Sequence, residues 1–214
     1  PHIASGAHAR PPGGAARPRQ RGVELNMALP ARPFWFLRHG ETDLNAARLA
    51  QGSGIDAGLN ATGRAQAERV GPLLAGQEIT AIIASPLQRA RQTAEIINEF
   101  LRLPLSIEPD LREVAFGSME GQPLLPWFPD WLEGRVTPDG AESFVLLTRR
   151  VEAALRRILP SQQGPVLLVA HGGVFRAMRE LMGLPKEGRT AHALPIFCDH
   201  TGEGWQASSP DLGI

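Results

Sequence analysis

The sequence predicts an α/β fold, a three-layer sandwich in which a mainly parallel central sheet is flanked by helices. Apolar runs of strand length alternate with segments whose apolar residues recur at helical spacing. The strand-like runs are continuously apolar, as in sheets covered on both faces. A chain of 214 residues with 43% hydrophobic content can bury such a core.

The domain is predicted over residues 31–214. Residues 1–30 are rich in Ala, Gly, Pro and Arg and have no apolar periodicity. Such a segment buries too little surface to offset its ordering entropy. We therefore expect a disordered or extraneous N-terminal tail.

In the first half of the domain, two strands are each followed by a helix. Phe34–Leu37 is a buried strand, and Thr62 is the expected N-cap of the helix that follows. Ala81–Ala84 is the second strand, with Ser85 as cap and Pro86 as first residue of the next helix. The apolar face of that helix comprises Leu87, Ala90, Ala94, Ile97 and Leu101.

The second half opens with a short strand at Leu105–Ile107. Residues 111–140 lose periodicity and gain Gly, Pro and Trp, and so long an irregular segment is often functional. A helix resumes near Glu142. Val166–Ala170 is the strongest strand, and Val174–Met182 the helix after it. Leu194–Phe197 is expected at a sheet edge, because it contains Pro195.

Polar residues follow three of these strands directly. They are Arg38-His39, Ser85 to Arg89, and His171-Gly172. Ligands of parallel α/β sheets bind beyond the carboxyl ends of the strands. The sequence therefore predicts a site formed by these three groups.

The charge balance and the cysteine content argue against several classes of function. Lys plus Arg and Asp plus Glu each total 22, so no net charge favours nucleic acid or an anionic membrane. No apolar run has the length of a membrane span. Cys198 is the sole cysteine, which excludes an internal disulfide or a thiolate cluster. We expect a cytoplasmic protein that binds neither nucleic acid nor membranes. Its oligomeric state stays open, a homodimer included.

The residues after the first strand suit a phosphate ligand. A histidine can present one ring nitrogen to a substrate while the other donates to a carbonyl. Arg38 can fork onto two phosphoryl oxygens. Arg38-His39-Gly40 alone is a weak signal, because a solvated pair at a turn has the same sequence.

Four motifs in order resemble the histidine phosphatase superfamily, the phosphoglycerate mutase-like group. The resemblance covers roughly Phe34 to Phe197. The motifs are Arg38-His39-Gly40-Glu41-Thr42 with Asn45, Leu59, Gly63 and Gln66-Ala67; Ser85-Pro86-Leu87-Gln88-Arg89-Ala90-Arg91-Gln92-Thr93-Ala94; Leu111-Arg112-Glu113 with Phe116-Gly117 and Glu120-Gly121; and Val169-Ala170-His171-Gly172-Gly173-Val174.

The resemblance implies hydrolysis of a small-molecule phosphomonoester. His39 would be the nucleophile that becomes phosphorylated. Glu113 would donate a proton to the leaving oxygen and then activate water. No metal or other cofactor is implied. The phosphoryl oxygens would be held by Arg38, Asn45, Arg89, His171 and the backbone N–H of Gly172. The nearby cations should also disfavour protonation of His39.

Within this family, the choice lies between phosphatase and mutase. Resemblance to the mutases predicts a longer insertion with basic residues for a second anionic group. Ser118 to Ala141 is compact and has one basic residue, Arg135. Its aromatic residues, Trp127, Phe128 and Trp131, either receive an apolar leaving group or pack the loop onto the core. We therefore favour hydrolysis over mutase activity.

Two readings from other classes stay open. A phosphate-binding or interaction module without catalysis would be expected to lack a member of the catalytic set, and none is missing. A histidine-metal hydrolase would need paired ligands. His192 and His200 lack that spacing and are assigned to surface or packing roles.

Overall fold

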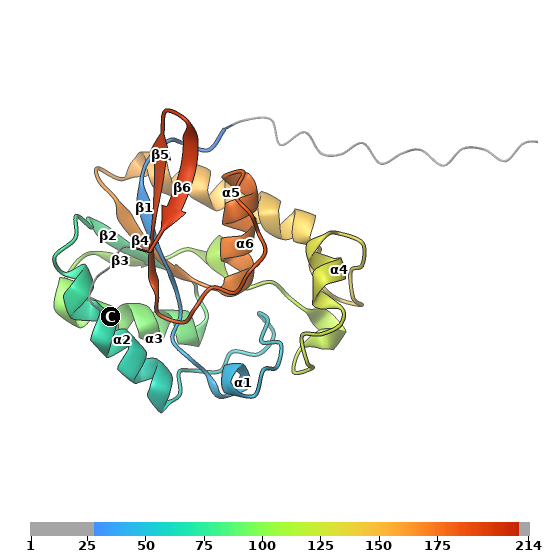
Figure 1. The fold of residues 1–214 in the computed structure, drawn as a ribbon. Helices are drawn as coiled ribbons and strands as arrows, with labels where there is room; N and C mark the ends of the chain where they lie inside the picture. Colours follow the sequence, from blue (N-terminus) through green and yellow to red (C-terminus); the bar gives the residue numbers. More distant parts are fainter. Residues whose placement is uncertain (1–27, 210–214) are drawn as a thin grey trace, which may run out of the picture.

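The computed structural model describes residues 28–209, which form a six-stranded sheet between two helical layers (Figure 1). The strand order is β3-β2-β4-β1-β5-β6. The strands are β1 Phe34–Arg38, β2 Ala81–Ala84, β3 Leu105–Ile107, β4 Val166–Ala170, β5 Pro195–Thr201 and β6 Gly204–Ser208. The helices are α1 Asp43–Ala46, α2 Ala61–Leu74, α3 Gln88–Leu101, α4 Phe128–Leu132, α5 Phe144–Ser161 and α6 Gly172–Leu181, with 3₁₀ turns η1 Pro109–Leu111 and η2 Gly117–Met119.

The four strands from β3 to β1 are parallel, as predicted, whereas β5 and β6 are antiparallel. The expected edge strand at Leu194–Phe197 is wrong, because β5 lies inside the sheet between β1 and β6. Pro195 is tolerated as the first residue of β5, where a missing N–H costs little. Because β5 runs against β1, its first residue lies at the edge where β1 ends; Pro195 pairs with Leu37.

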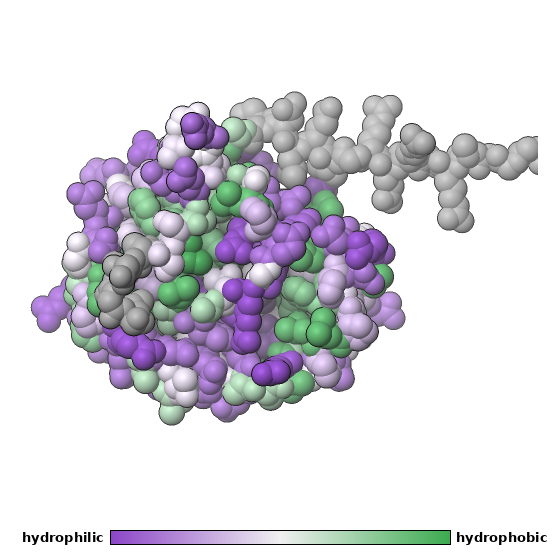
Figure 2. Space-filling model, in the orientation of Figure 1, coloured by the Kyte–Doolittle hydropathy of each residue, from purple (hydrophilic) through white to green (hydrophobic). Residues whose placement is uncertain are grey.

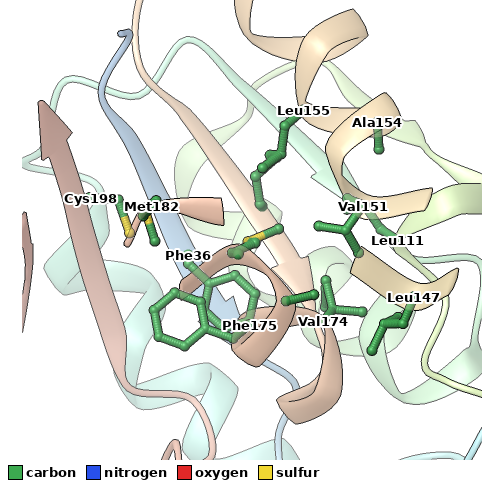
Figure 3. Close-up of a cluster of buried hydrophobic side chains, with 14 of the residues drawn as sticks. Phe36, Leu111, Leu147, Val151, Ala154, Leu155, Val174, Phe175, Met182 and Cys198 are labelled. Atoms are coloured by element: carbon green, nitrogen blue, oxygen red, sulfur yellow. The ribbon is translucent and has the colours of Figure 1, made fainter. Parts of the chain in front are cut away.

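Each face of the sheet carries its own core. On one face α2 and α3 pack on the sheet, and on the other α5 and α6 do (Figure 1). On the α5 and α6 side the rings of Phe36 and Phe175 stack with centroids 4.2 Å apart, and Val174 lies close to Val151 and Leu147 of α5 (Figure 3). Burial of these apolar side chains fixes the sheet relative to both layers.

Three helices begin at residues other than those predicted. Asn60, not Thr62, caps α2, because its side chain accepts from the Gly63 N–H. α3 begins at Gln88 rather than Pro86. α6 begins at Gly172, two residues before the predicted start, so its N-terminus lies directly at the end of β4.

The domain also begins earlier than predicted. Leu29 is 5% exposed and belongs to the core beside α5, so the folded part includes residues from 28 onward. The rest of the predicted tail, residues 1–27, lies outside the described residues. Among residues 28–209, no helix is both long and apolar enough to cross a membrane.

The segment from Ser118 to Ala141, called the aromatic loop below, is mainly packed onto the core. Trp131 is fully buried and donates its indole N–H to the Glu142 carbonyl at 2.9 Å. Trp127 and Phe128 contact Phe116 edge-on. Hydrophobic surface gathers near α4 (Figure 2), where Leu125 is 72% exposed. The structure therefore assigns Trp131 to packing, and Phe128 also packs against the core while remaining partly exposed.

Candidate active site

His39 lies at the carboxyl end of β1, the parallel strand that borders the antiparallel β5. Its backbone N–H donates to the Ala170 carbonyl at 3.0 Å, which joins the ends of β1 and β4. The ring Nδ1 lies 2.7 Å from the Gly40 carbonyl. Because a carbonyl only accepts, Nδ1 carries the proton and Nε2 presents a lone pair.

The His39 imidazole is neutral at physiological pH. Its side chain is buried, and burial lowers the pKa well below the ordinary value of 6.5. The neighbouring charges of Arg89, His171 and Arg38 lower the pKa further, in that order. A neutral imidazole with a free lone pair is the form that a nucleophile requires.

Two glycines allow the loop that follows His39 to pack closely against the start of α2. A Cβ on Gly40 would lie 2.4 Å from the Gly63 carbonyl oxygen, and one on Gly63 would lie 2.1 Å from the Glu41 carbonyl oxygen. Any side chain at either position would separate the loop from the helix. The loop is also held through Gly40, whose N–H donates to Thr93 Oγ1 at 3.0 Å.

Arg38 and Arg89 are held by backbone carbonyls rather than by carboxylates. Arg38 donates through Nη1 to Thr190 O at 2.8 Å. Arg89, which is fully buried, donates through Nη1 to Ile55 O and through Nη2 to Gly52 O. The Nε of each has no partner among the described residues. Burial lowers the pKa of both to about 10, while Glu113 opposes the shift, so both remain charged at neutral pH.

His171 lies at the end of β4, beside His39. The two ring centroids are 5.1 Å apart. His171 Nε2 lies 2.6 Å from Ser85 Oγ, and its buried Nδ1 has no partner among residues 28–209. Burial, with Arg89 and Arg38, lowers the His171 pKa well below 6.5, so this ring is neutral too.

Glu113 reaches the same region from the segment after η1 and is 6% exposed. Its Oε1 accepts from the Val114 N–H at 3.0 Å, and its Oε2 accepts from the Gly173 N–H at 3.1 Å. A Cβ on Gly173 would lie 2.5 Å from Oε1. Glycine at this position is therefore what allows the carboxyl group to approach the start of α6.

The two remaining predicted phosphate ligands differ in how they are placed. The Gly172 N–H is the first of α6, and the first N–H groups of a helix lack intrahelical acceptors and favour anions. Asn45 belongs to a capping box, in which its Oδ1 accepts from the Thr42 N–H at 3.3 Å. Because Oδ1 is engaged in that bond, the side-chain NH2 group of Asn45 is the group that can donate to a ligand. Its contact with phosphate stays a prediction.

Sequence reasoning missed two groups at this site, His192 and Arg176. The His192 ring centroid lies 5.5 Å from that of His39, and its Nδ1 donates to the His39 carbonyl at 3.0 Å. Burial, then Arg38, lower its pKa to about 4. The antiparallel direction of β5 is the signal that would have placed His192, since the loop before β5 must return to this edge.

Arg176 lies one turn into α6. A Cβ on Gly172 would lie 3.4 Å from Arg176 Nη1 and 3.6 Å from Arg38 Nε, so the two guanidinium groups are neighbours. Long side chains of a helix point toward its N-terminus, which is the signal the sequence offered.

Buried side-chain atoms without a partner gather here. Of the seven such atoms among the described residues, six belong to Arg38, Arg89, His171, Arg176, Thr190 and His192. Native structures pair nearly all buried polar groups, so a local cluster of unpaired atoms marks a ligand site. The three predicted groups after β1, β2 and β4 are thus brought together, as expected.

Comparisons with known proteins identify the family of this chain. A family model described as histidine phosphatase superfamily (branch 1) matches residues 34–198. The "Uncharacterized phosphatase PhoE" of Bacillus subtilis (strain 168) is 38% identical over 149 residues, which are 67% of this chain and 73% of that protein. The "Probable phosphoglycerate mutase GpmB" of Yersinia pestis (strain Pestoides F) is 40% identical over 164 residues, 71% of this chain and 75% of that protein.

Solved structures show the same likeness. A mycobacterial glucosyl-3-phosphoglycerate phosphatase in complex with VO3 superposes with a TM-score of 0.73 at 29% identity, covering 84% of this chain and 98% of that one. The alpha-ribazole phosphatase of Shigella flexneri gives a TM-score of 0.68 at 26% identity, covering 83% and 95%. The chain belongs to the histidine phosphatase superfamily, as an enzyme of the phosphatase or mutase type.

Proposed function

We propose that this chain hydrolyses small phosphomonoesters in two steps, through a phosphohistidine at His39. The observation that carries the proposal is the set of buried, unpaired atoms around the His39 ring: Arg38 Nε, Arg89 Nε and His171 Nδ1. Phosphoryl transfer depends mainly on positioning and on stabilising charge at the equatorial oxygens. Two fixed guanidinium groups supply that charge.

In the first step, His39 Nε2 attacks phosphorus while the ester oxygen departs on the opposite side. The new N–P bond forms as the P–O bond to the leaving group breaks, and Glu113 gives its proton to that oxygen. In the second step, Glu113 takes a proton from water, the resulting hydroxide attacks phosphorus, and the N–P bond breaks. Inorganic phosphate and neutral His39 are regenerated. Two easier steps replace one difficult step.

Ser85 would set the tautomer of His171. Ser85 Oγ accepts from the Leu87 N–H at 3.3 Å, which leaves its own proton free to be donated to His171 Nε2 at 2.6 Å. With Nε2 accepting, the proton of the neutral ring resides on Nδ1. His171 Nδ1–H is then a donor to a phosphoryl oxygen.

The test is phosphate release from p-nitrophenyl phosphate and from alkyl phosphates, with and without chelator. His39→Ala should lower turnover by at least about three orders of magnitude, since it removes the nucleophile. His200→Gln is the matched control, because His200 is exposed on β5. Turnover that survives in His39→Ala would reject the mechanism. Loss of turnover with chelator would favour the metal hydrolase instead, and release by neither variant nor parent chain would favour a binding module.

Mutase activity is a second candidate, favoured by the relatives that carry a mutase name. A mutase must return the phosphoryl group to its product before water intervenes. Interconversion of 2- and 3-phosphoglycerate, followed beside phosphate release, separates the two. We expect release to predominate; interconversion faster than release would overturn this preference.

A further inference from the structure

Arg176 is an arginine of α6 whose guanidinium group is held by backbone carbonyls and by no carboxylate among the described residues. Its Nη1 donates to Gly172 O at 3.2 Å and its Nη2 to Gly188 O at 2.8 Å. Its buried Nε has no partner, and no carboxylate lies within ion-pair distance of it, among residues 28–209. By contrast, Arg135 of the aromatic loop pairs with Asp130. The charge of Arg176 is therefore held in place but not neutralised.

The segment 188–190 joins Arg176 to the phosphate site. The Gly188 carbonyl accepts from Arg176, and the Thr190 carbonyl accepts from Arg38. Between them, Arg189 is exposed and makes no hydrogen bond or ion pair within the described part of the chain. Its charge lowers the pKa of Arg38, Arg176 and His192, after the larger effect of burial, so it lies near all three.

Phe128 closes the other side of Arg176. The guanidinium carbon lies 5.1 Å from the Phe128 ring centroid. Arg176 is thus bounded by the start of α6, by the 188–190 segment and by α4. A group attached to a phosphate at Arg38 would meet Arg176 next.

When a phosphomonoester is bound, positive charge at Arg176 is left without a negative partner. Arg38 and Arg89 match the two negative charges of a phosphomonoester. Glu113 is the acidic group whose charge acts most on Arg176, and it is neutral when it holds the proton for the leaving oxygen. Arg176 and Arg189 are then unmatched, next to where the leaving group departs.

We propose that Arg176 and Arg189 form a subsite for a second anionic group, a carboxylate or a second phosphate, carried by the leaving portion of the substrate. The proposal rests on the phosphatase function above and narrows its substrates to phosphomonoesters with two anionic groups. Guanidinium groups bind both anions through paired N–H donors. The aromatic loop has no unpaired basic residue, since Arg135 pairs with Asp130, and the unpaired charge is supplied by α6 and the 188–190 segment instead.

The test compares matched pairs of compounds that differ in the second anion. The first pair is 3-phosphoglycerate and glycerol 3-phosphate, and the second is fructose 1,6-bisphosphate and fructose 6-phosphate. Affinity is measured calorimetrically in a His39→Ala background, and kcat/KM in the parent chain. We expect at least a tenfold preference for the member that carries the second anionic group in one pair, and the preferred pair identifies carboxylate or phosphate.

Variants assign the preference to the two arginines. Arg189→Gln and Arg176→Lys should each reduce the ratio within the preferred pair by about tenfold, and Arg189→Gln should change kcat/KM of the member without the second anionic group less than threefold. Arg135→Gln, which removes an exposed charge from the aromatic loop, should leave the ratio unchanged. An equal loss for both members in Arg176→Lys would indicate that Arg176 only anchors Gly188.

The possible outcomes distinguish failure of the anion subsite from failure of the proposed phosphatase activity. Hydrolysis of glycerol 3-phosphate without any preference, unchanged in Arg189→Gln, would overturn the subsite and leave the phosphatase intact. No turnover of any compound would reject the phosphatase. The binding ratio in the His39→Ala background still tests the subsite in that case.

Discussion

At the residue scale, the site depends on which nitrogen of each imidazole carries a proton. Gly40 O fixes Nδ1–H on His39, and Ser85 is positioned to fix the tautomer of His171. The two rings lie close together and are both neutral, yet they would have opposite roles toward the substrate. One offers a lone pair to phosphorus, and the other offers a proton to a phosphoryl oxygen.

Ser85→Ala should therefore impair catalysis without a matching loss of fold. Without the hydroxyl, the His171 proton can move to Nε2 and a donor to a charged phosphoryl oxygen is lost, at a cost of about tenfold or more in kcat. Ser85→Thr keeps the hydroxyl and should keep most of the activity. Nitrogen-15 NMR of His171 reports the tautomer directly, and an unchanged tautomer in Ser85→Ala would contradict the assignment.

Glu113→Gln should act according to the leaving group. The amide keeps the shape of the side chain but cannot give a proton, so alkyl phosphates should slow by about a hundredfold or more. p-Nitrophenyl phosphate, whose leaving group needs no proton, should slow much less in its first step. Burst kinetics with both substrates measure that step. Equal slowing would show that Glu113 is not the acid.

At the element scale, three strand ends and one helix start meet at a single edge of the sheet. β1, β2 and β4 are parallel and adjacent, so the residues that follow them converge (Figure 1). The close approach of the His39 loop to α2 completes the arrangement, and it depends on Gly63.

Gly63→Ala should therefore damage both stability and activity. Its Cβ would lie 2.1 Å from Glu41 O, so the loop or the helix must shift, at a cost of about 1–3 kcal/mol in the free energy of unfolding. Gly76→Ala is the matched control, because a Cβ there meets nothing within 4 Å. Urea unfolding and phosphate release on both variants provide the test, and equal behaviour would contradict the packing argument.

At the scale of the whole molecule, three neutral histidines, of which His39 and His171 are buried and His192 is half-buried, tie stability to pH. Burial lowers the pKa of His39 and His171 well below 6.5 and that of His192 to about 4. Between those values and about 6.5 the unfolded chain binds protons that the folded chain does not. The free energy of unfolding is therefore not reduced by these three rings above pH 6.5. It falls as the pH decreases below that value, because the unfolded chain is then stabilised by protonation of the same rings.

The free energy of unfolding, measured with urea in phosphate-free buffer, should therefore decline as the pH falls from about 6.5 towards 4. His192→Asn should flatten part of this decline, and His200→Gln should not change it. A stability that is constant over this interval would show that these rings are not held neutral.

The sequence predicted the parallel core and the three groups after its strands, because continuous apolar runs and strand-end polar residues are local signals. It did not predict β6 or the internal position of β5, since polar and exposed residues such as Asp199 and Gln206 mask their strand pattern. His192 and Arg176 were missed for a related reason. Their place at the site is set by tertiary direction, the antiparallel return of β5 and the tilt of a helical side chain, which no local pattern encodes.

The most direct test of the central claim is to trap the covalent intermediate. The chain is mixed with a ³²P-labelled phosphomonoester, quenched in alkali within milliseconds, digested and analysed by mass spectrometry. We predict a phosphoryl group that is stable in alkali, labile in acid and located on His39, absent in His39→Ala and more persistent in Glu113→Gln. Turnover with no labelled protein at any time point, or with the label on another residue, would contradict the account.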